Sequence, residues 1–299
     1  MQKEKNVVAL GFFDGVHIGH AALLNRVNEK ARQLGVSPAV LSFDAHPDTV
    51  VFGKAVPLIN SMDGRAELMK RLFGIEKNFV VHFDKEKMHQ PWQEFIQALI
   101  AESNAVHFVV GHDFRFGYKG EGTAEKLSAY CGERGIGCDI IPAVKLDGIT
   151  VSSTIIRKLL EEGKIEEANR FLGHPHTLTD TVHEGFRLGR TISFPTINMR
   201  FPEGVLVPKH GVYASKAHFD GSEHRAVTNI GIRPTVAGNS AAVSVESFIL
   251  DYSGDLYGHN VRIEFLSFIR PEEKFGSVDE LKDQIRKDAE LARAALEKK

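Results

Sequence analysis

The stretch Gly11-Phe12-Phe13-Asp14-Gly15-Val16-His17-Ile18-Gly19-His20 decides the fold of the first half of this chain. It follows the apolar run Val7-Val8-Ala9-Leu10, which is typical of a buried parallel strand. It precedes a helical pattern with apolar residues at Leu23, Val27, Ala31 and Leu34. A strand, a glycine-rich turn and a helix N-terminus in this order direct backbone N–H groups at an anion, usually phosphate.

Two histidines strengthen the prediction of a phosphate loop at residues 11–20. His17 and His20 are three residues apart, so they share a face of the first helical turn. Glycines at 11, 15 and 19 let the backbone approach a ligand closely. A helix-capping loop with incidental histidines and a metal site are the alternatives, but no third metal ligand lies nearby in the sequence. A nucleotide phosphate is favoured over both.

Composition limits the class of protein. The chain has 299 residues, of which 42% are hydrophobic and 25% charged, which predicts a globular protein with two domains. Its net charge of -2 gives no electrostatic reason to expect a nucleic acid or a membrane as partner. Cys131 and Cys138 form no metal or redox motif, and no targeting or membrane-spanning segment is recognised. We therefore expect a cytoplasmic protein.

The first half alternates strands and helices. A helical pattern covers residues 92–101, and repeated βα units predict a parallel sheet with helices on both faces. The further strands are expected at Ala39-Val40-Leu41-Ser42-Phe43, Phe79-Val80-Val81-His82-Phe83, Val106-His107-Phe108-Val109-Val110 and Cys138-Asp139-Ile140-Ile141.

Polar residues follow these strands where open α/β sheets bind ligands. His46-Pro47 follows the second strand, and residues 111–117 follow the fourth. Ser152, Ser153 and Thr154 open a helix after the fifth, with Arg157 one turn further on. Hydroxyls and backbone donors at a helix start suit a triphosphate, although the same residues could serve only as a helix N-cap.

The pattern changes near residue 175. Gly173 and Pro175 end the last helix of the α/β half, and short β-type runs separated by turn residues then continue to about residue 269. These runs predict an antiparallel β-barrel, and residues 278–298 predict a helix that covers it. We expect one domain at residues 1–175 and a second at 176–299.

The second half has its own candidate site. Thr196 and Asn198 are two apart on an extended segment, so both point to one face and offer oxygen ligands for Mg²⁺. Strand alternation directs Glu246 away from the side of Val243 and Val245. Alternation alone indicates a solvated strand glutamate.

Together the α/β segments resemble the adenylyltransferase module of the bacterial bifunctional riboflavin kinase/FAD synthetases, over nearly all of residues 6–175. The decapeptide is similar to that family's form of the nucleotidyltransferase HIGH motif, and residues 152–157 to its counterpart of the KMSKS loop. The resemblance implies that His17, His20 and Arg157 are catalytic. It implies ATP binding by Gly11, Phe13, Asp14, Gly15, Gly19, Ser152, Ser153 and Thr154, and flavin binding by His46, Pro47, Asp113, Phe114 and Phe116.

Residues 176–299 resemble the riboflavin kinase module of the same family. The resemblance implies that Glu246 is the base for the riboflavin 5′-hydroxyl and that Arg270 lies near the flavin. It assigns Thr196 and Asn198 to Mg²⁺, and Gly189, Arg190 and Pro195 to ATP. The motif from Asn229 to Thr235 is similar to the family's N-x-G-x-R-P-T turn, and Leu256-Tyr257-Gly258 also matches.

Several positions depart from the family pattern. They are Asp44-Ala45 for Glu-Pro, Gly120 and Thr123 for Arg and Asp, Ile155 for Arg, Ser193 for Gly, and Phe248 for His. The residues expected to contact phosphate are intact.

The resemblance implies a bifunctional enzyme that uses ATP as co-substrate and Mg²⁺ as cofactor. The barrel would convert riboflavin to FMN with release of ADP, and the first domain would convert FMN to FAD with release of pyrophosphate. Nothing in the sequence indicates an oligomeric state. The alternatives are a synthetase-like enzyme that activates a carboxylic acid and a non-catalytic flavin-binding regulator. The first predicts an acid- or tRNA-binding region, which the second half with its Pro-Thr-x-Asn motif and Glu246 fits poorly. The second predicts damaged catalytic positions, which are not found.

Overall fold

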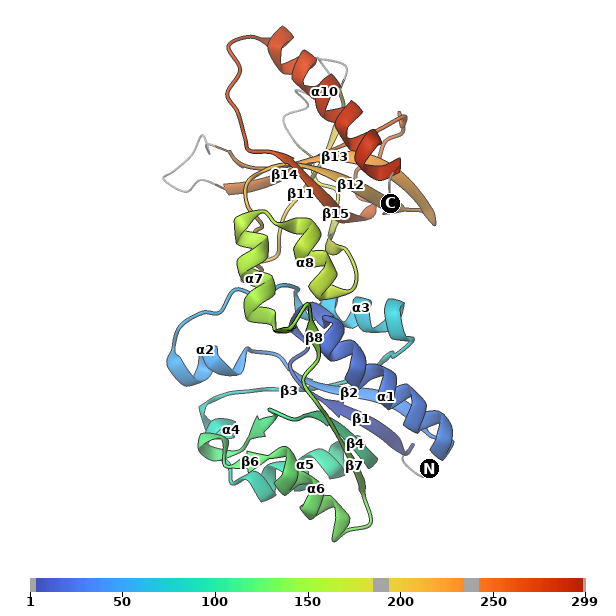
Figure 1. The fold of residues 1–299 in the computed structure, drawn as a ribbon, viewed down its shortest axis with the longest axis vertical. Helices are drawn as coiled ribbons and strands as arrows, with labels where there is room; N and C mark the ends of the chain where they lie inside the picture. The colour runs from blue at the N-terminus through green and yellow to red at the C-terminus, as the bar shows by residue number, and fades with distance from the viewer. Residues whose placement is uncertain (1–3, 185–193, 234–241, 298–299) are drawn as a thin grey trace. The chain divides into compact units, whose positions relative to one another are not determined.

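The computed structural model describes residues 4–184, 194–233 and 242–297 (Figure 1). The chain divides into two compact units, Met1–Ser153 and Thr154–Lys299. This division lies before residue 175, where the sequence pattern changes, and it groups two helices with the barrel.

Within the described residues, the first unit is built on a five-stranded parallel sheet in the order β3-β2-β1-β4-β7. Its strands are β1 (Asn6–Leu10), β2 (Ser37–Phe43), β3 (Lys77–Val81), β4 (Ala105–Gly111) and β7 (Gly137–Ile141). The chain runs from β1 outward to β3, then returns to the other side of β1 at β4. The carboxyl ends of β1 and β4 therefore flank the point where strand order reverses, which is where such sheets bind ligands.

Helices cover both faces of this sheet, as the sequence predicts. Val7 and Ala9 pack with α1 (Ile18–Leu34) and α3 (Met62–Phe73), whereas Val8 and Leu10 pack with α5 (Trp92–Ser103) and α6 (Ala124–Gly132). Alternate residues of β1 thus enter opposite cores, so the whole strand is buried. The shorter elements are α2 (Pro47–Phe52), α4 (Lys85–His89), β5 (Arg115–Phe116), β6 (Gly122–Thr123), β8 (Lys145–Leu146) and β9 (Ile149–Thr150).

The second unit curls six antiparallel strands of the described chain into a partly closed barrel in the order β10-β15-β12-β13-β14-β11. The two outer strands are linked where His183 N donates to Asn198 O at 2.9 Å. The motif from Asn229 to Arg233, expected to be a turn, instead forms the end of a strand. The strands are β10 (His176–Thr181), β11 (Thr196–Met199), β12 (Gly211–Phe219), β13 (Ser222–Arg233), β14 (Ala242–Ile249) and β15 (Asn260–Arg270).

Buried hydroxyls cross the inner face of this sheet. Ser215 Oγ lies 2.7 Å from Thr228 Oγ1, which lies 2.8 Å from Ser247 Oγ. Ser215 Oγ also donates to Ala226 O at 3.2 Å. These three hydroxyls, the hydroxyl ladder, satisfy one another in the interior, where an unpaired polar group would be costly. His176 is also buried and stacks against Phe201 and Phe265.

Helices flank the barrel within the second unit. α7 (Ser153–Glu162) leads into α8 (Ile165–Leu172), where Asn169 Nδ2 donates to Phe265 O at 2.8 Å and Asn169 Oδ1 accepts from His176 N at 2.7 Å. The C-terminal helix α10 (Val278–Glu297) packs Ala289 and Ala292 on the outer face of the sheet, as expected. Figure 1 shows α10 lying across the strands.

Candidate active sites

The phosphate loop has a strained backbone. After β1, Phe13 has φ 60°, Gly15 has φ 82° and Val16 has φ 44°, all in the left-handed region. Asp14 holds this turn, because its buried Oδ1 accepts hydrogen bonds from Ile59 N at 2.8 Å and Asn60 N at 3.3 Å. Non-glycine residues adopt such angles at a cost and only when surrounding contacts enforce them. The loop is therefore already shaped before a ligand binds.

The two histidines stack at the start of α1. His17 is the N-cap of the helix, and its Nδ1 accepts from His20 N at 3.3 Å. The two rings lie 3.6 Å apart between centroids. Burial, followed by the nearby charges of His17 and Arg65, lowers the pKa of His20 well below its usual value. His20 is thus neutral at pH 7 in the unliganded protein.

Arg65 of α3 is a member of this site that sequence reasoning missed. Its guanidinium donates to Phe12 O, to Ser42 Oγ at 3.2 Å and to Phe43 O at 3.3 Å, and it lies over the Phe12 ring. The side chain is buried and ties the ends of β1 and β2 together. No motif surrounds Arg65 in the sequence, so only the fold reveals it.

The serine segment reaches the same loop. Ser153 Oγ donates to Asp14 O at 2.9 Å, which brings Ser152 and Ser153 to the phosphate loop within the first unit. Thr154 and Arg157 belong to α7 in the second unit.

The residues assigned to flavin differ in their surroundings. His46 caps α2, with Pro47 as the next residue, and its ring meets Phe12 edge-on at 4.8 Å. Phe114 is half-buried and stacks on Phe116, which is itself only 6% exposed and packs on Trp92 and Phe95. Asp113 is exposed. Phe116 therefore supports the core, whereas Phe114 and His46 lie closer to the surface.

In the second unit, several candidate residues occupy paired positions on neighbouring strands and so form one row across the sheet. Asn198 of β11 pairs with Glu246 of β14, Glu246 with Asn229 of β13, Asn229 with Val212 of β12, and Val212 with Arg270 of β15. Directly paired residues of neighbouring antiparallel strands share one face. We call Asn198, Glu246 and Asn229 the polar row. Glu246 faces away from buried Val245, as the alternation predicts.

Thr196 joins this row from the next position on the same face. Thr196 Oγ1 donates to Glu246 Oε2 at 3.4 Å. A pocket beside it is lined by Pro195 and Thr196 and, from other segments, by Val182, Ile249, Tyr252, Leu256 and Tyr257. The Leu-Tyr-Gly motif thus lies next to the Pro-Thr-x-Asn motif. Gly189 and Arg190 lie outside the described residues.

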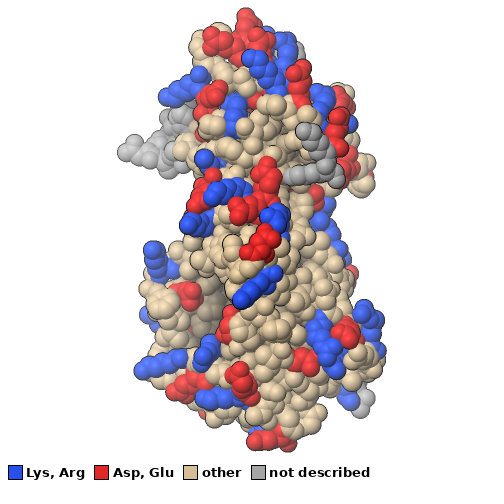
Figure 2. Space-filling view, in the orientation of Figure 1, with Lys and Arg blue, Asp and Glu red and all other residues tan. Residues whose placement is uncertain are grey.

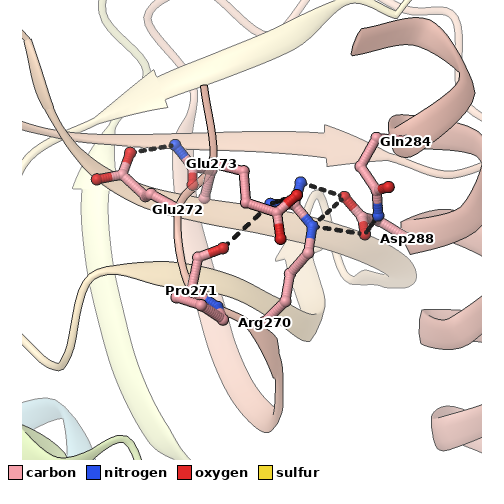
Figure 3. Close-up of polar contacts among 7 residues, drawn as sticks. Arg270, Pro271, Glu272, Glu273, Gln284 and Asp288 are labelled. Carbon is pink, nitrogen blue, oxygen red and sulfur yellow. Dashed lines mark hydrogen bonds and ion pairs between the residues drawn. The ribbon is translucent and has the colours of Figure 1, made fainter. Parts of the chain in front are cut away.

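Arg270 is held inside the second unit by α10 (Figure 3). Its Nε and Nη2 donate to the Asp288 carboxylate, with the shortest contact at 2.7 Å, and its Nη1 donates to Pro271 O at 3.1 Å. Gln284 Nε2 donates to the same carboxylate at 2.9 Å. Sequence reasoning named Arg270 but missed Asp288, because nothing in the surrounding sequence indicates that this aspartate is buried.

Comparisons with known proteins agree for both units. Family models described as FAD synthetase and riboflavin kinase match residues 1–155 and 172–296, respectively. A bifunctional riboflavin kinase/FMN adenylyltransferase of Listeria monocytogenes is 38% identical over 98% of this chain and 93% of that protein. The same-named protein of Escherichia coli K12 is 35% identical over 97% of this chain and 93% of that protein.

A solved structure is also similar over nearly the whole chain. It is a crystal structure described as a macrolide-efflux protein from Streptococcus pneumoniae, with a TM-score of 0.85 and 31% identity, covering 98% of this chain and 95% of that chain. In the described part of this chain, no helix combines the length and apolarity needed to cross a membrane. Basic and acidic side chains are interspersed over the face shown in Figure 2.

The residues assembled here and the matches along both units lead to one conclusion. The chain belongs to the family of bifunctional riboflavin kinases/FMN adenylyltransferases.

Proposed function

We propose that the second unit transfers the γ-phosphoryl group of ATP to the 5′-hydroxyl of riboflavin, with Glu246 as the base. The observation that carries this proposal is the polar row, in which Glu246 lies in register between Asn198 and Asn229 and its carboxylate accepts from Thr196. A primary hydroxyl is too weakly acidic to ionise at neutral pH. Glu246 therefore takes its proton as the bond to phosphorus forms.

Thr196 and Asn198 are the residues that would hold Mg²⁺. They present a hydroxyl and an amide oxygen on one face, and Mg²⁺ prefers a few protein oxygens together with phosphate oxygens. The ion would neutralise charge on the transferring phosphoryl group. The pocket beside Thr196 would be where ATP approaches this segment.

We further propose that the first unit transfers AMP from ATP to the FMN phosphate, with release of pyrophosphate. The FMN phosphate is already a nucleophile, so the protein need only position the reactants and stabilise charge. His17 and His20 meet the phosphates at the N-terminus of α1, whose dipole favours anions. Ser152 and Ser153, which lie at the phosphate loop, would complete the triphosphate site of the first unit.

The flavin ring would lie beside His46, Pro47 and Phe114, where aromatic side chains reach the carboxyl ends of the strands. The flavin of the second unit would lie near Arg270, whose side chain is held by Asp288. The adenylyltransferase would comprise residues 1–175 and the kinase residues 176–299. The free thiols of Cys131 and Cys138 are consistent with a cytoplasmic location.

The test is incubation of the purified chain with riboflavin, ATP and Mg²⁺, followed by separation of the flavins. We expect FMN to appear first and FAD to follow, with ADP and pyrophosphate as the other products. Recovery of riboflavin unchanged would contradict the kinase assignment, and FMN without FAD would contradict the adenylyltransferase assignment. ATP–pyrophosphate exchange driven by a carboxylic acid would favour the synthetase-like alternative.

A further inference from the structure

The chain that follows β15 turns back toward the polar row. Asn229 Nδ2 lies 3.5 Å from Glu272 Oε1 and donates to it. A Cβ atom added at Gly231 would lie 2.0 Å from the same oxygen, so a larger residue there would displace the Glu272 carboxylate. Glu272 thus lies over β13 beside Asn229, which is the register partner of Glu246. Figure 3 shows Glu272 at this position.

The position of Glu272 depends on how the preceding residue is anchored. The Arg270 and Asp288 side chains are 15% and 3% exposed, so their ion pair is shielded from water. A bidentate, buried pair of this kind fixes orientation as well as distance. Glu272 follows Arg270 by two residues. The ion pair between Arg270 and Asp288 therefore fixes the place where the backbone of Glu272 leaves the sheet.

The hydrogen bonds of Arg270 are made within the protein. Its Nε and Nη2 contact Asp288, its Nη1 contacts Pro271 O, and Glu273 lies 4.0 Å away. The guanidinium therefore acts by holding the chain.

Asp288, the other member of this ion pair, is also held in place. Asp288 accepts from Gln284 one turn earlier, and the next residue, Ala289, packs with Val212 and Val227 on the face that carries the polar row. Val212 pairs with Asn229 on one side and with Arg270 on the other. Helix α10 therefore packs beside Asn229, at the end of the polar row.

We propose that Asp288 is a positioning residue for riboflavin binding, which acts through Arg270 to hold the Glu272 carboxylate beside Asn229. There Glu272 accepts hydrogen bonds from hydroxyl groups of the ribityl chain next to the hydroxyl that Glu246 deprotonates. The inference rests on the proposed kinase function. It adds a ribityl-binding residue, Glu272, and the helix residue that holds it in place.

The experiment measures KM for riboflavin and kcat of FMN formation in the full chain for Asp288→Asn, Glu272→Gln and the double variant. We expect each single change to raise KM about tenfold while kcat changes little, because the charged acceptor for the ribityl hydroxyls is replaced by a weaker neutral one or is displaced, and Glu246 is untouched. The double variant should show the same KM as the single ones, because both act on one contact. Glu290→Gln, an exposed carboxylate on α10, is the matched control and should match the wild type.

The outcomes separate the inference from the function on which it rests. Wild-type protein that makes no FMN contradicts the proposed function. Normal FMN formation with an unchanged KM for riboflavin in Glu272→Gln overturns the inference. A KM in the double variant that is raised by the product of the two single increases also overturns it. Circular dichroism and the urea midpoint of each variant report whether its second unit is folded. If Asp288→Asn does not fold, Glu272→Gln alone decides, since Glu272 is exposed and its change leaves the core intact.

Discussion

The phosphate loop gathers its chemistry from residues 11–20, whereas the polar row draws Asn198, Asn229 and Glu246 from three separate strands. The loop is shaped by backbone angles that Asp14 enforces over a short distance. The row is shaped by strand register, which depends on the whole sheet. A local site should respond to changes in its own few residues, and a register-built site to changes anywhere that shift the strands.

The largest effect should follow removal of the base from the polar row. Glu246→Gln keeps size and hydrogen bonding but cannot accept the proton, so FMN formation should fall by roughly 10²–10⁴-fold. Riboflavin should still bind, and FAD formation from supplied FMN should persist. Glu223→Gln, an exposed glutamate at the start of β13, is the control. Near-normal FMN formation by Glu246→Gln would contradict a role as base and favour the interpretation of Glu246 as a solvent-exposed strand residue.

The corresponding change in the phosphate loop should be nearly as large and affect only the other activity. His20→Ala should reduce FAD formation by on the order of 10²–10³, because one contact to developing charge is lost. FMN should then accumulate from riboflavin. His259→Ala, at a half-exposed position far along the sequence, should leave both activities unchanged. Equal loss of both activities in folded His20→Ala would contradict a local role.

Fragments test whether the register-built site needs its flanking helix. Fragments of residues 154–299 and 176–299 should both make FMN, but the shorter one should be less stable, because it loses the Asn169 contacts to Phe265 and His176. Activity and urea midpoints of the two fragments measure this. Equal stability would show that α8 contributes nothing to the barrel.

A smaller effect isolates backbone strain. Gly15→Ala and Gly35→Ala both place a side chain at positive φ, 82° and 65°, and should each cost about 1–2 kcal/mol of stability. Gly35 ends α1 with open space around it, so only Gly15→Ala should also slow FAD formation. Thermal unfolding and FAD assays on both variants make the comparison. Equal activities would mean that the loop tolerates a shift of its backbone.

A last effect, on stability alone, concerns pH. Burial lowers the pKa of His176 from 6.5 to about 3, so the folded protein keeps the ring neutral while the unfolded chain gains a proton below pH 6.5. Stability is therefore lost as pH falls from about 6.5 toward 3, by up to about 1.4 kcal/mol per pH unit. His176→Phe should remove this slope, measured by urea midpoints at pH 7 and pH 4.5. An unchanged slope would assign acid sensitivity to other groups.

The same contrast explains what could be predicted from the sequence. The parallel sheet, its helices and the stacked histidines follow from short contiguous patterns, so β1, α1 and the pair His17–His20 were predictable. Arg65, Glu272 and Asp288 were not, since each acquires its role from a partner far along the chain. The resemblance implied a turn at the motif from Asn229 to Thr235, yet its described part, Asn229 to Arg233, pairs with β14 as a strand. Leu34 fits the helical stripe but is 50% exposed at the end of α1.

The hydroxyl ladder of Ser215, Thr228 and Ser247 has a consequence for how the barrel finds its alignment. Apolar side chains alone tolerate sliding, because one methyl group substitutes for another. Hydroxyls in a dry interior do not, since a strand displaced by two residues would keep the same face inward yet leave donors and acceptors unmatched. The ladder therefore makes one strand register more stable than others that would bury the same apolar surface. By fixing β12, β13 and β14 against one another on the inner face, it also decides which residue stands opposite Glu246 on the outer one.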